Sequence, residues 1–421
     1  MNILMVLIFV IGYIIITLEH KFKVNKAAIA LLMAVFCWGF NFIENFPPDE
    51  ASLHRLIEHL GEISQVIIFL IGAMTIVALI EAHHGFRIIA NFIRTKNKIK
   101  IFWSISIITF FLSAVLDNLT TSIIMVTLTR QLIDDRNDRM FFSAMVIIAA
   151  NAGGAWTPIG DVTTTMLWIG GRVTTSHLMK LLLIPSLIST LIPLLYLSRY
   201  IKNDSIVFSQ KSDEASQRVR HAKKVFFLGI AALISVPILK ALLGMPPYMG
   251  IMAGLGVMWV ITDLINHEQH HLRVPHILTK IDISSVLFFL GILLAVAALE
   301  TAGILNHLAL WMDTHFKDTG IIVSFMGLIS SIIDNVPLTA AAMGMYGLNV
   351  YPVDSKFWQM IAYCVGTGGS ILIIGSAAGV VVMGMEKITF GWYLKKISLP
   401  VLIGYFLGIG SFLMIYHVIY G

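Results

Sequence analysis

The stretch Ser113–Met125, SAVLDNLTTSIIM, decides how the rest of this chain is read. An aspartate and an asparagine stand side by side in it, Asp117-Asn118, and three hydroxyl residues follow. Apolar residues extend for several turns on both sides, and an ionisable group at such depth is costly unless a partner, a cavity or an ion compensates it. The same arrangement returns at Ser330–Met343, SSIIDNVPLTAAAM, and this repetition predicts ion binding.

The composition indicates a polytopic α-helical membrane protein. Apolar residues make up 57% of the 421 residues and charged residues 13%, whereas soluble proteins carry about a quarter charged residues. Segments of roughly 20 apolar residues recur, which is long enough to cross the hydrocarbon core. The net charge of +5 does not indicate nucleic-acid binding, because the basic residues fall in short loops. Cys37 and Cys364 lie in apolar segments and suggest neither a disulfide nor a metal site.

Two interruptions divide the apolar segments of the first half. The run 101–130 is too long for one crossing, so we expect a re-entrant hairpin with Asp117-Asn118 at its tip, surrounded by protein or water. The run 140–168 is broken by NAGGAWTPIGD at Asn151–Asp161, where glycines and a proline free backbone groups. The remaining expected helices are 1–18 (a retained helix rather than a signal peptide), 26–44, 62–82 and 177–200.

The second half repeats this plan after a polar linker at 201–224. Expected helices cover 225–243, 247–265, 282–301 and 397–420, with a hairpin near 320–348 and a broken helix at 356–385. Matching residues recur at offsets of 219, 217 and 215: Gly72 and Glu81 with Gly291 and Glu300, Asp117-Asn118 with Asp334-Asn335, and Gly153-Gly154 and Ile159-Gly160 with Gly368-Gly369 and Ile374-Gly375. The chain is therefore expected to form two inverted repeats, 1–200 and 225–421, each with about five transmembrane helices, one hairpin and one broken helix.

The distribution of basic residues predicts the orientation. With the N-terminus outside, the cytoplasmic loops hold 23 of the 29 Lys and Arg residues, as the positive-inside rule requires. The acidic loop 45–61 then lies outside, and so do both termini. We expect a multi-pass protein of the inner membrane.

The motifs LDNLTTSIIM and NAGGAWTPIGDVTTTMLWIGG closely resemble those of the NhaD-type sodium/proton antiporters of the ion transporter superfamily. The resemblance implies a homodimer with a scaffold domain and a transport domain, and cation sites between each hairpin and the adjacent broken helix. Relatives that carry dicarboxylates place serine at the hairpin tips, where this chain has Asp117 and Asp334. The pattern departs further after Asn335, where Val336-Pro337 replaces the threonine of the Ser-Asn-Thr tip.

Sodium is a hard cation that prefers oxygen ligands, by extension from calcium and magnesium. The predicted Na⁺ ligands are carboxylates and amides, with further cation-binding oxygens beside them. A buried carboxyl disfavours its charged form, so Na⁺ and H⁺ would compete for it, with Asp117, Asp161 and Asp334 as proton carriers. The full predicted set is Asp117, Asn118, Asp161, Asp334 and Asn335 for Na⁺, together with Asn151, Thr157, Thr367 and Ser370.

Structural alternatives stand beside these assignments. Asp117 could be only a hairpin cap, and Asp161 an N-cap for a helix that starts at Val162. Asn151 and Thr157 could satisfy broken backbone, and Thr163 and Thr164 could be ligands or back-bonded hydroxyls. Interfacial positions account for the carboxylates Glu81 and Glu300 and for His83 and His84, with a functional role as the second interpretation. Gly250 and Gly254, and Gly404 and Gly408, have the spacing of close helix packing.

We predict a secondary Na⁺/H⁺ antiporter, with Li⁺ as a further candidate ion, no cofactor and no enzymatic activity. The alternative within the superfamily is a transporter of arsenite or a dicarboxylate. A membrane-embedded protease is a second class, because His267–His271, HEQHH, has the HExxH pattern. It lies in a short loop without an evident third ligand.

Overall fold

The computed structural model describes residues 2–17, 22–44, 50–90, 93, 95–201, 221–267, 269–316 and 318–420. Within these ranges the regular secondary structure is entirely helical, and no strand occurs. Most of the predicted linker, 202–220, lies outside the described residues. The all-helical prediction is therefore confirmed for the part of the chain that the structure describes.

Among the residues that the structure describes, seven helices are long and apolar enough to cross a membrane, so the chain is a multi-pass membrane protein. Their hydrophobic parts agree with the segments predicted from the sequence. They are α3 (Lys26–Glu44), α4 (Glu50–Ala82), α10 (Thr175–Leu197), α11 (Ala222–Leu243), α12 (Pro247–Ile265), α14 (Ile283–Thr301) and α21 (Ser398–Tyr420).

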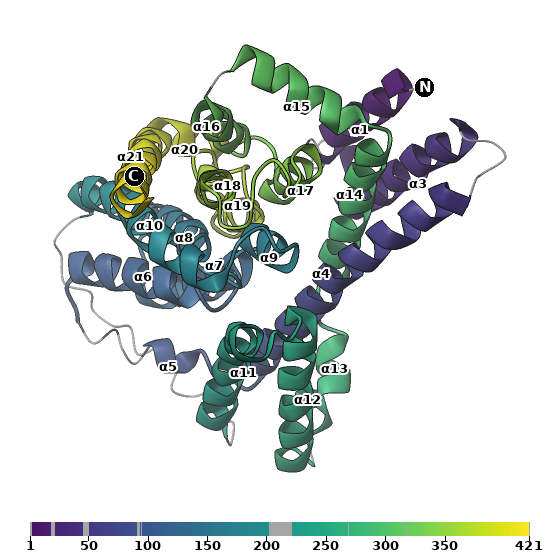
Figure 1. Cartoon of the computed structure of the whole chain (residues 1–421). Coiled ribbons are helices and arrows are strands. Elements are labelled where there is room, and N and C mark those ends of the chain that lie inside the picture. The colour runs from purple at the N-terminus through teal and green to yellow at the C-terminus, as the bar shows by residue number, and fades with distance from the viewer. Residues whose placement is uncertain are drawn as a thin grey trace.

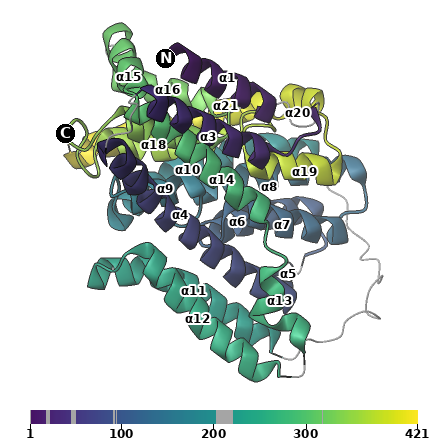
Figure 2. The same cartoon turned by 90° about the vertical axis from the view of Figure 1, so that its right-hand side faces the viewer.

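Six helices form what we call the frame bundle: α1 (Asn2–Thr17), α3, α4, α11, α12 and α14. In Figure 1, α4 and α14 cross the molecule diagonally, and in Figure 2, α11 and α12 lie side by side below α4. Trp38 and Asn41 of α3 donate to backbone carbonyls of α14, each at 3.0 Å. Gly250 and Gly254 let α12 approach α11, since a Cβ there would lie 3.1–3.2 Å from Ala232 and Val236 side chains.

The other group, the site bundle, is built from interrupted helices. Both interruptions predicted in each half occur at the expected residues. The pairs are α6 (Lys98–Ser113) with α7 (Asn118–Leu132), α8 (Arg136–Gly154) with α9 (Val162–Ile169), α16 (Thr319–Ile329) with α17 (Asn335–Met345), and α18 (Lys356–Gly368) with α19 (Ala377–Glu386). Helices α10, α20 (Phe390–Lys396) and α21 pack around them.

The two halves of the site bundle make the same contacts. Ser113 donates to the carbonyl of Ala150 at 2.6 Å, and Ser330 donates to that of Val365 at 2.8 Å. A Cβ on Gly153 would overlap the carbonyl of Phe110, and one on Gly368 would overlap that of Gly327. These glycines therefore let the first helix of each pair lie against the backbone of its neighbour. The contacts occur at the positions that the sequence repeat pairs.

Two helical segments differ from the sequence prediction. Helix α4 begins at Glu50, so most of the expected loop 45–61 is helical. The first turns of α4 are polar, so the pattern of apolar runs did not predict them. The whole helix of 33 residues is about 50 Å long and therefore exceeds the hydrocarbon thickness. Helix α15 (Ile304–His315) exposes Leu310 and Trp311, and its apolar run is too short for a crossing.

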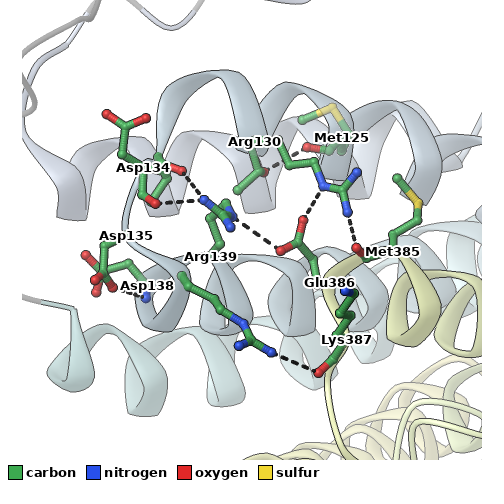
Figure 3. Close-up of polar contacts among 12 residues, drawn as sticks. Met125, Arg130, Asp134, Asp135, Asp138, Arg139, Met385, Glu386 and Lys387 are labelled. Atoms are coloured by element: carbon green, nitrogen blue, oxygen red, sulfur yellow. Dashed lines mark hydrogen bonds and ion pairs between the residues drawn. The ribbon is translucent and has the colours of Figure 1, made fainter.

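An ionic cluster joins the halves at the ends of α7, α8 and α19 (Figure 3). Glu386 is buried and accepts from Nε of Arg130 at 2.5 Å and from Nε of Arg139 at 3.3 Å. Arg130 also donates to the backbone carbonyl of Met385. Because an unpaired buried charge is strongly destabilising, these contacts hold α19 against α7 and α8.

His83 joins the ends of α4 and α12. It is buried, its Nδ1 lies 2.8 Å from the carbonyl of Leu79, and its Nε2 lies 2.8 Å from the amide nitrogen of Asn266. The carbonyl can only accept, so the neutral ring with its proton on Nδ1 satisfies both contacts. Burial lowers the pKa of His83, and the charges of His84 and His271 act in the same direction when protonated.

Replacing Gly153 with alanine should destabilise the protein by at least about 1–3 kcal/mol, because a backbone carbonyl cannot move aside as a flexible side chain can. Gly384→Ala is the matched control, since a Cβ at this glycine of α19 meets nothing within 4 Å. The measurement is the temperature at which detergent-purified protein loses its monodisperse peak. Equal melting temperatures for the two variants would contradict the packing described for α8 and α6.

Stability should fall as the pH decreases below about 6.5, because the unfolded chain then protonates His83 more readily than the folded protein does. The loss levels off once the pH passes below the lowered folded pKa. His83→Gln should flatten this part of the melting-temperature profile between pH 7 and pH 5, whereas His54→Gln, at an exposed position of α4, should leave it unchanged. The same slope in wild type and His83→Gln would argue against a buried neutral histidine.

Candidate functional site

Side chains cap the N-termini of four helices that follow the interruptions, and three of these caps are aspartates of the predicted site. The caps of α7, α9, α17 and α19 are Asp117, Asp161, Asp334 and Ser376. Each side chain accepts a backbone N–H from the first turn of its helix, at 2.8 to 3.3 Å. Helix N-termini carry partial positive charge, which stabilises a carboxylate placed there. The capping alternative is thus present in the structure, and it leaves further carboxylate lone pairs available.

A central cavity of about 80 Å³ brings the predicted residues together. Its polar wall comes from the helix interruptions of the site bundle. The frame bundle contributes an apolar wall that includes Phe69 of α4, Leu233 of α11 and Phe289 of α14. The cavity therefore lies between the two bundles. The five residues predicted to bind Na⁺ all line it: Asp117, Asn118, Asp161, Asp334 and Asn335.

The second half supplies the hydrogen-bond partner of the first half's extra carboxylate. The amide nitrogen of Asn335 donates to both carboxylate oxygens of Asp161, at 3.2 and 3.0 Å. Asp161 is 1% exposed, and the Cβ of an alanine at Gly366 of α18 would lie 3.4 Å from its Oδ2. The site thus depends on residues from both halves of the chain.

A second network runs through Asn151. Asn118 donates to the Asn151 carbonyl oxygen at 2.9 Å, and the Asn151 amide nitrogen donates to Ser370 and Ser376 at 2.9 Å each. Because Asn118 and Asn335 both use their nitrogens in this way, their carbonyl oxygens are left over. Throughout the described ranges, no donor reaches either carbonyl oxygen, so both are available to a cation.

The other predicted oxygens lie away from the cavity wall. Thr157 donates to the carbonyl of Ala114 and Thr367 to that of Tyr363, each at 2.6 Å, and Ser370 accepts from Asn151. Their assignment as cation ligands stays a prediction. The structure does separate two threonines that the sequence could not. Thr164 is back-bonded to the carbonyl of Asp161 at 2.9 Å, whereas the buried hydroxyl of Thr163 has no partner among the described residues.

The chemistry that this cavity offers is coordination by oxygen. No three acidic, histidine or cysteine side chains come close enough to hold one metal ion within the ranges that the structure describes. A cation in the cavity would therefore take its ligands from few carboxylates and from amide and main-chain oxygens. Such a set suits an alkali cation, which needs less charge than a transition metal.

Sequence reasoning overlooked Ser113 and Ser330, whose hydroxyls fix the turn before each aspartate. The signal was present, because these serines repeat at the same offset as Asp117 and Asp334. The apolar wall from the frame bundle could not be foreseen, since nothing in the pattern tells which faces of α4, α11 and α14 meet the site.

The histidine loop lacks the geometry of a zinc protease. Glu268 lies outside the described residues. His267 stands in a turn and His271 in the 3-10 helix η2 (His270–Leu272), so they do not share a face of one α-helix as the HExxH motif requires.

Comparison with known proteins gives the family. The citrate transporter family matches residues 4–358. Sodium/proton antiporter 1 of Arabidopsis thaliana is 47% identical over 99% of this chain and 73% of its own length. Sodium/proton antiporter 2 of the same plant is 46% identical over 98% of this chain and 99% of its own. The Na(+)/H(+) antiporter NhaD of Vibrio cholerae is 28% identical over 98% and 91%. The chain therefore belongs to the citrate transporter family, in the group that contains the NhaD-type sodium/proton antiporters, as its two motifs implied.

Proposed function

We propose that this protein is a secondary antiporter that exchanges Na⁺ for H⁺ across the membrane. One observation carries the proposal: Asp117, Asp161 and Asp334 line a single cavity together with two amide carbonyls that no donor in the described ranges reaches. The names of the relatives, sodium/proton antiporters at 46–47% identity, support the same exchange. Li⁺ is a further candidate, because it has the same charge and the same preference for oxygen.

The proposed mechanism is competition for Asp161. As a carboxylate, Asp161 attracts Na⁺, and the carbonyl oxygens of Asn335 and Asn118 complete the coordination. Burial disfavours the charged form, so a proton that reaches the cavity neutralises Asp161 and releases the cation. Asp117 and Asp334 act as additional proton carriers at the same cavity. Exchange follows if the cavity opens alternately to each side, as in other transporters with broken helices.

The architecture that we propose is two inverted repeats, 1–200 and 225–421. The matched contacts of Ser113 with Ala150 and of Ser330 with Val365 support the repeat. The frame bundle would be the fixed scaffold of a homodimer and the site bundle the moving part. The concentration of Lys and Arg in one set of loops supports an inner-membrane orientation with both termini outside.

A transporter of an anion such as arsenite or a dicarboxylate is the second candidate, and the family's description as citrate transporters favours considering it. An anion would need cationic or neutral partners. The residues that line the central cavity include three aspartates and, within the described ranges, no Lys or Arg. Repulsion between these carboxylates and an anion therefore favours the cation.

The test uses everted membrane vesicles that carry a pH gradient reported by a fluorescent dye. Addition of Na⁺ to wild-type vesicles should dissipate the gradient. Asp161→Asn, Asp117→Asn and Asp334→Asn should each raise the Na⁺ concentration for half-maximal response by about 10- to 100-fold, since a bond to a charged group is worth about 1.5–3 kcal/mol. Ser376→Ala, at the repeat counterpart of Asp161, should have a smaller effect.

The controls separate the competing classes of function. His267→Ala and His271→Ala should leave the exchange unchanged, whereas a membrane protease would need them. Citrate, succinate or arsenite in place of Na⁺ should produce no response. Wild type without any Na⁺ response, or full exchange in all three aspartate variants, would refute the antiport mechanism.

A further inference from the structure

We propose that a second cavity of the protein is an external vestibule that concentrates Na⁺ before it reaches the central cavity, with Glu62 and Glu300 attracting the cation and Arg172 competing with it. The inference rests on the proposed antiport and specifies where the ion is received on one side of the membrane.

The vestibule is a cavity of about 380 Å³ between the two bundles. Its walls come from α4 and α14 of the frame bundle and from α9 and α17 of the site bundle. Figure 1 shows α9 and α17 on the side of the site bundle that is nearer to α4 and α14. It is larger than the central cavity by several-fold and has room for a hydrated cation. Its polar lining distinguishes it from the largely apolar wall around the central cavity.

Charged side chains of both signs line this space. Glu62 of α4 is exposed and Glu300 of α14 is half-buried, and His59 lies one turn before Glu62, where its Nε2 lies 3.3 Å from the hydroxyl of Thr301. Two carboxylates in a cleft with low-dielectric walls focus the electric field and raise the local concentration of cations. Glu300, which the sequence repeat pairs with Glu81, thereby has a role in the vestibule. Glu81 does not share this role, because it is exposed at the C-terminal end of α4, away from Glu62.

Arg172 faces the same cavity from the loop after α9. Its guanidinium lies 5.0 Å from the ring centre of Trp358 and donates to the carbonyl of Met343 at 3.4 Å. Its Nε is buried without a partner, and no ion pair of Arg172 occurs in the ranges that the structure describes. The Arg172 guanidinium shares the cavity with the Glu62 and Glu300 carboxylates but is bonded to neither. Its fixed positive charge therefore competes with Na⁺ for electrostatic attraction to these two carboxylates.

The vestibule lies directly before the central cavity. Val66 and Met166 line its wall, and Phe69 and Thr165, which stand beside them on the same two helices, line the central cavity. Because Val66 and Phe69 are buried and apolar, they separate the two spaces in this conformation. A cation held by Glu62 and Glu300 would therefore need only to pass this apolar contact on α4 to reach Asp161.

The sequence repeat does not reproduce the vestibule's pair of glutamates. The offset of 219 that relates Glu81 to Glu300 places Ile281 at the position equivalent to Glu62. Arg172 precedes α10, at the end away from the loops rich in Lys and Arg. The positive-inside rule assigns that end to the outside.

The test measures the Na⁺ concentration for half-maximal exchange separately on each face, in right-side-out and in everted vesicles. In right-side-out vesicles, where Na⁺ meets the external face, the double variant Glu62→Gln/Glu300→Gln should raise the half-maximal Na⁺ concentration on the order of tenfold. In everted vesicles the same variant should leave that concentration unchanged. Arg172→Gln should lower the half-maximal Na⁺ concentration on the external face, whereas Arg172→Lys should keep that concentration close to the wild-type value. Choline chloride at high concentration should shrink the external difference, because salt screens exposed charges.

Glu81→Gln is the matched control and should change neither value. Glu62→Gln alone, at an exposed position, guards against loss of folding in the double variant. An unchanged value in right-side-out vesicles, an equal rise on both faces, or a rise confined to everted vesicles would overturn the vestibule while leaving the antiport intact. Wild-type vesicles that exchange no Na⁺ for H⁺ would instead overturn the proposed function, and the vestibule with it.

Discussion

The bond between Asn335 and Asp161 is the interaction on which the rest of the site depends. A carboxylate that is 1% exposed must be compensated, and here an amide from the other half of the chain contacts both of its oxygens. The Asn335 amide reaches Asp161 only because the chain turns at Asp334 between α16 and α17. The Asp161 carboxylate can accept these bonds because the helix is interrupted between α8 and α9. The interruptions of the helices are therefore consequences of the same need: polar side chains and helix ends must meet inside an apolar protein.

Much of this could be predicted because each interruption has a local cause. Thr120 follows Asp117 by three residues and donates to its two carboxylate oxygens, from the backbone N–H at 2.8 Å and from the hydroxyl at 2.6 Å, so the cap is encoded in neighbouring residues. Gly153 and Gly160 stand where a backbone must approach closely, and their repeat counterparts do the same. The partner of Asp161 could not be predicted from local sequence, because Asn335 is 174 residues away and its choice depends on how the halves pack. The early start of α4 could not be predicted for another reason, since its first turns are polar and resemble a loop.

The halves are alike in fold but unlike in charge. Asp161 corresponds to Ser376, and both cap a half-helix, yet one brings a carboxylate to the cavity and the other accepts from Asn151. A strictly symmetric site would place either two such carboxylates or none in the enclosed space. With two, their mutual repulsion would favour proton uptake over cation binding. In the mechanism proposed above, this single extra carboxylate is the group for which H⁺ and Na⁺ compete.

The contacts within and between the bundles decide what can move. Inside the site bundle, Glu386 is held by two arginines, and Asn151 connects α7, α8 and the α18–α19 interruption, so separating these elements would leave buried polar groups without partners. Against the frame bundle, the wall of the central cavity is largely apolar, with Phe69, Leu233 and Phe289 in it. Apolar contacts can be exchanged for other apolar contacts at little cost, whereas bonded polar groups cannot. Alternating access by movement of the site bundle as one body along the frame bundle therefore requires the fewest bonds to break, and it carries Asp161 and Asn335 together.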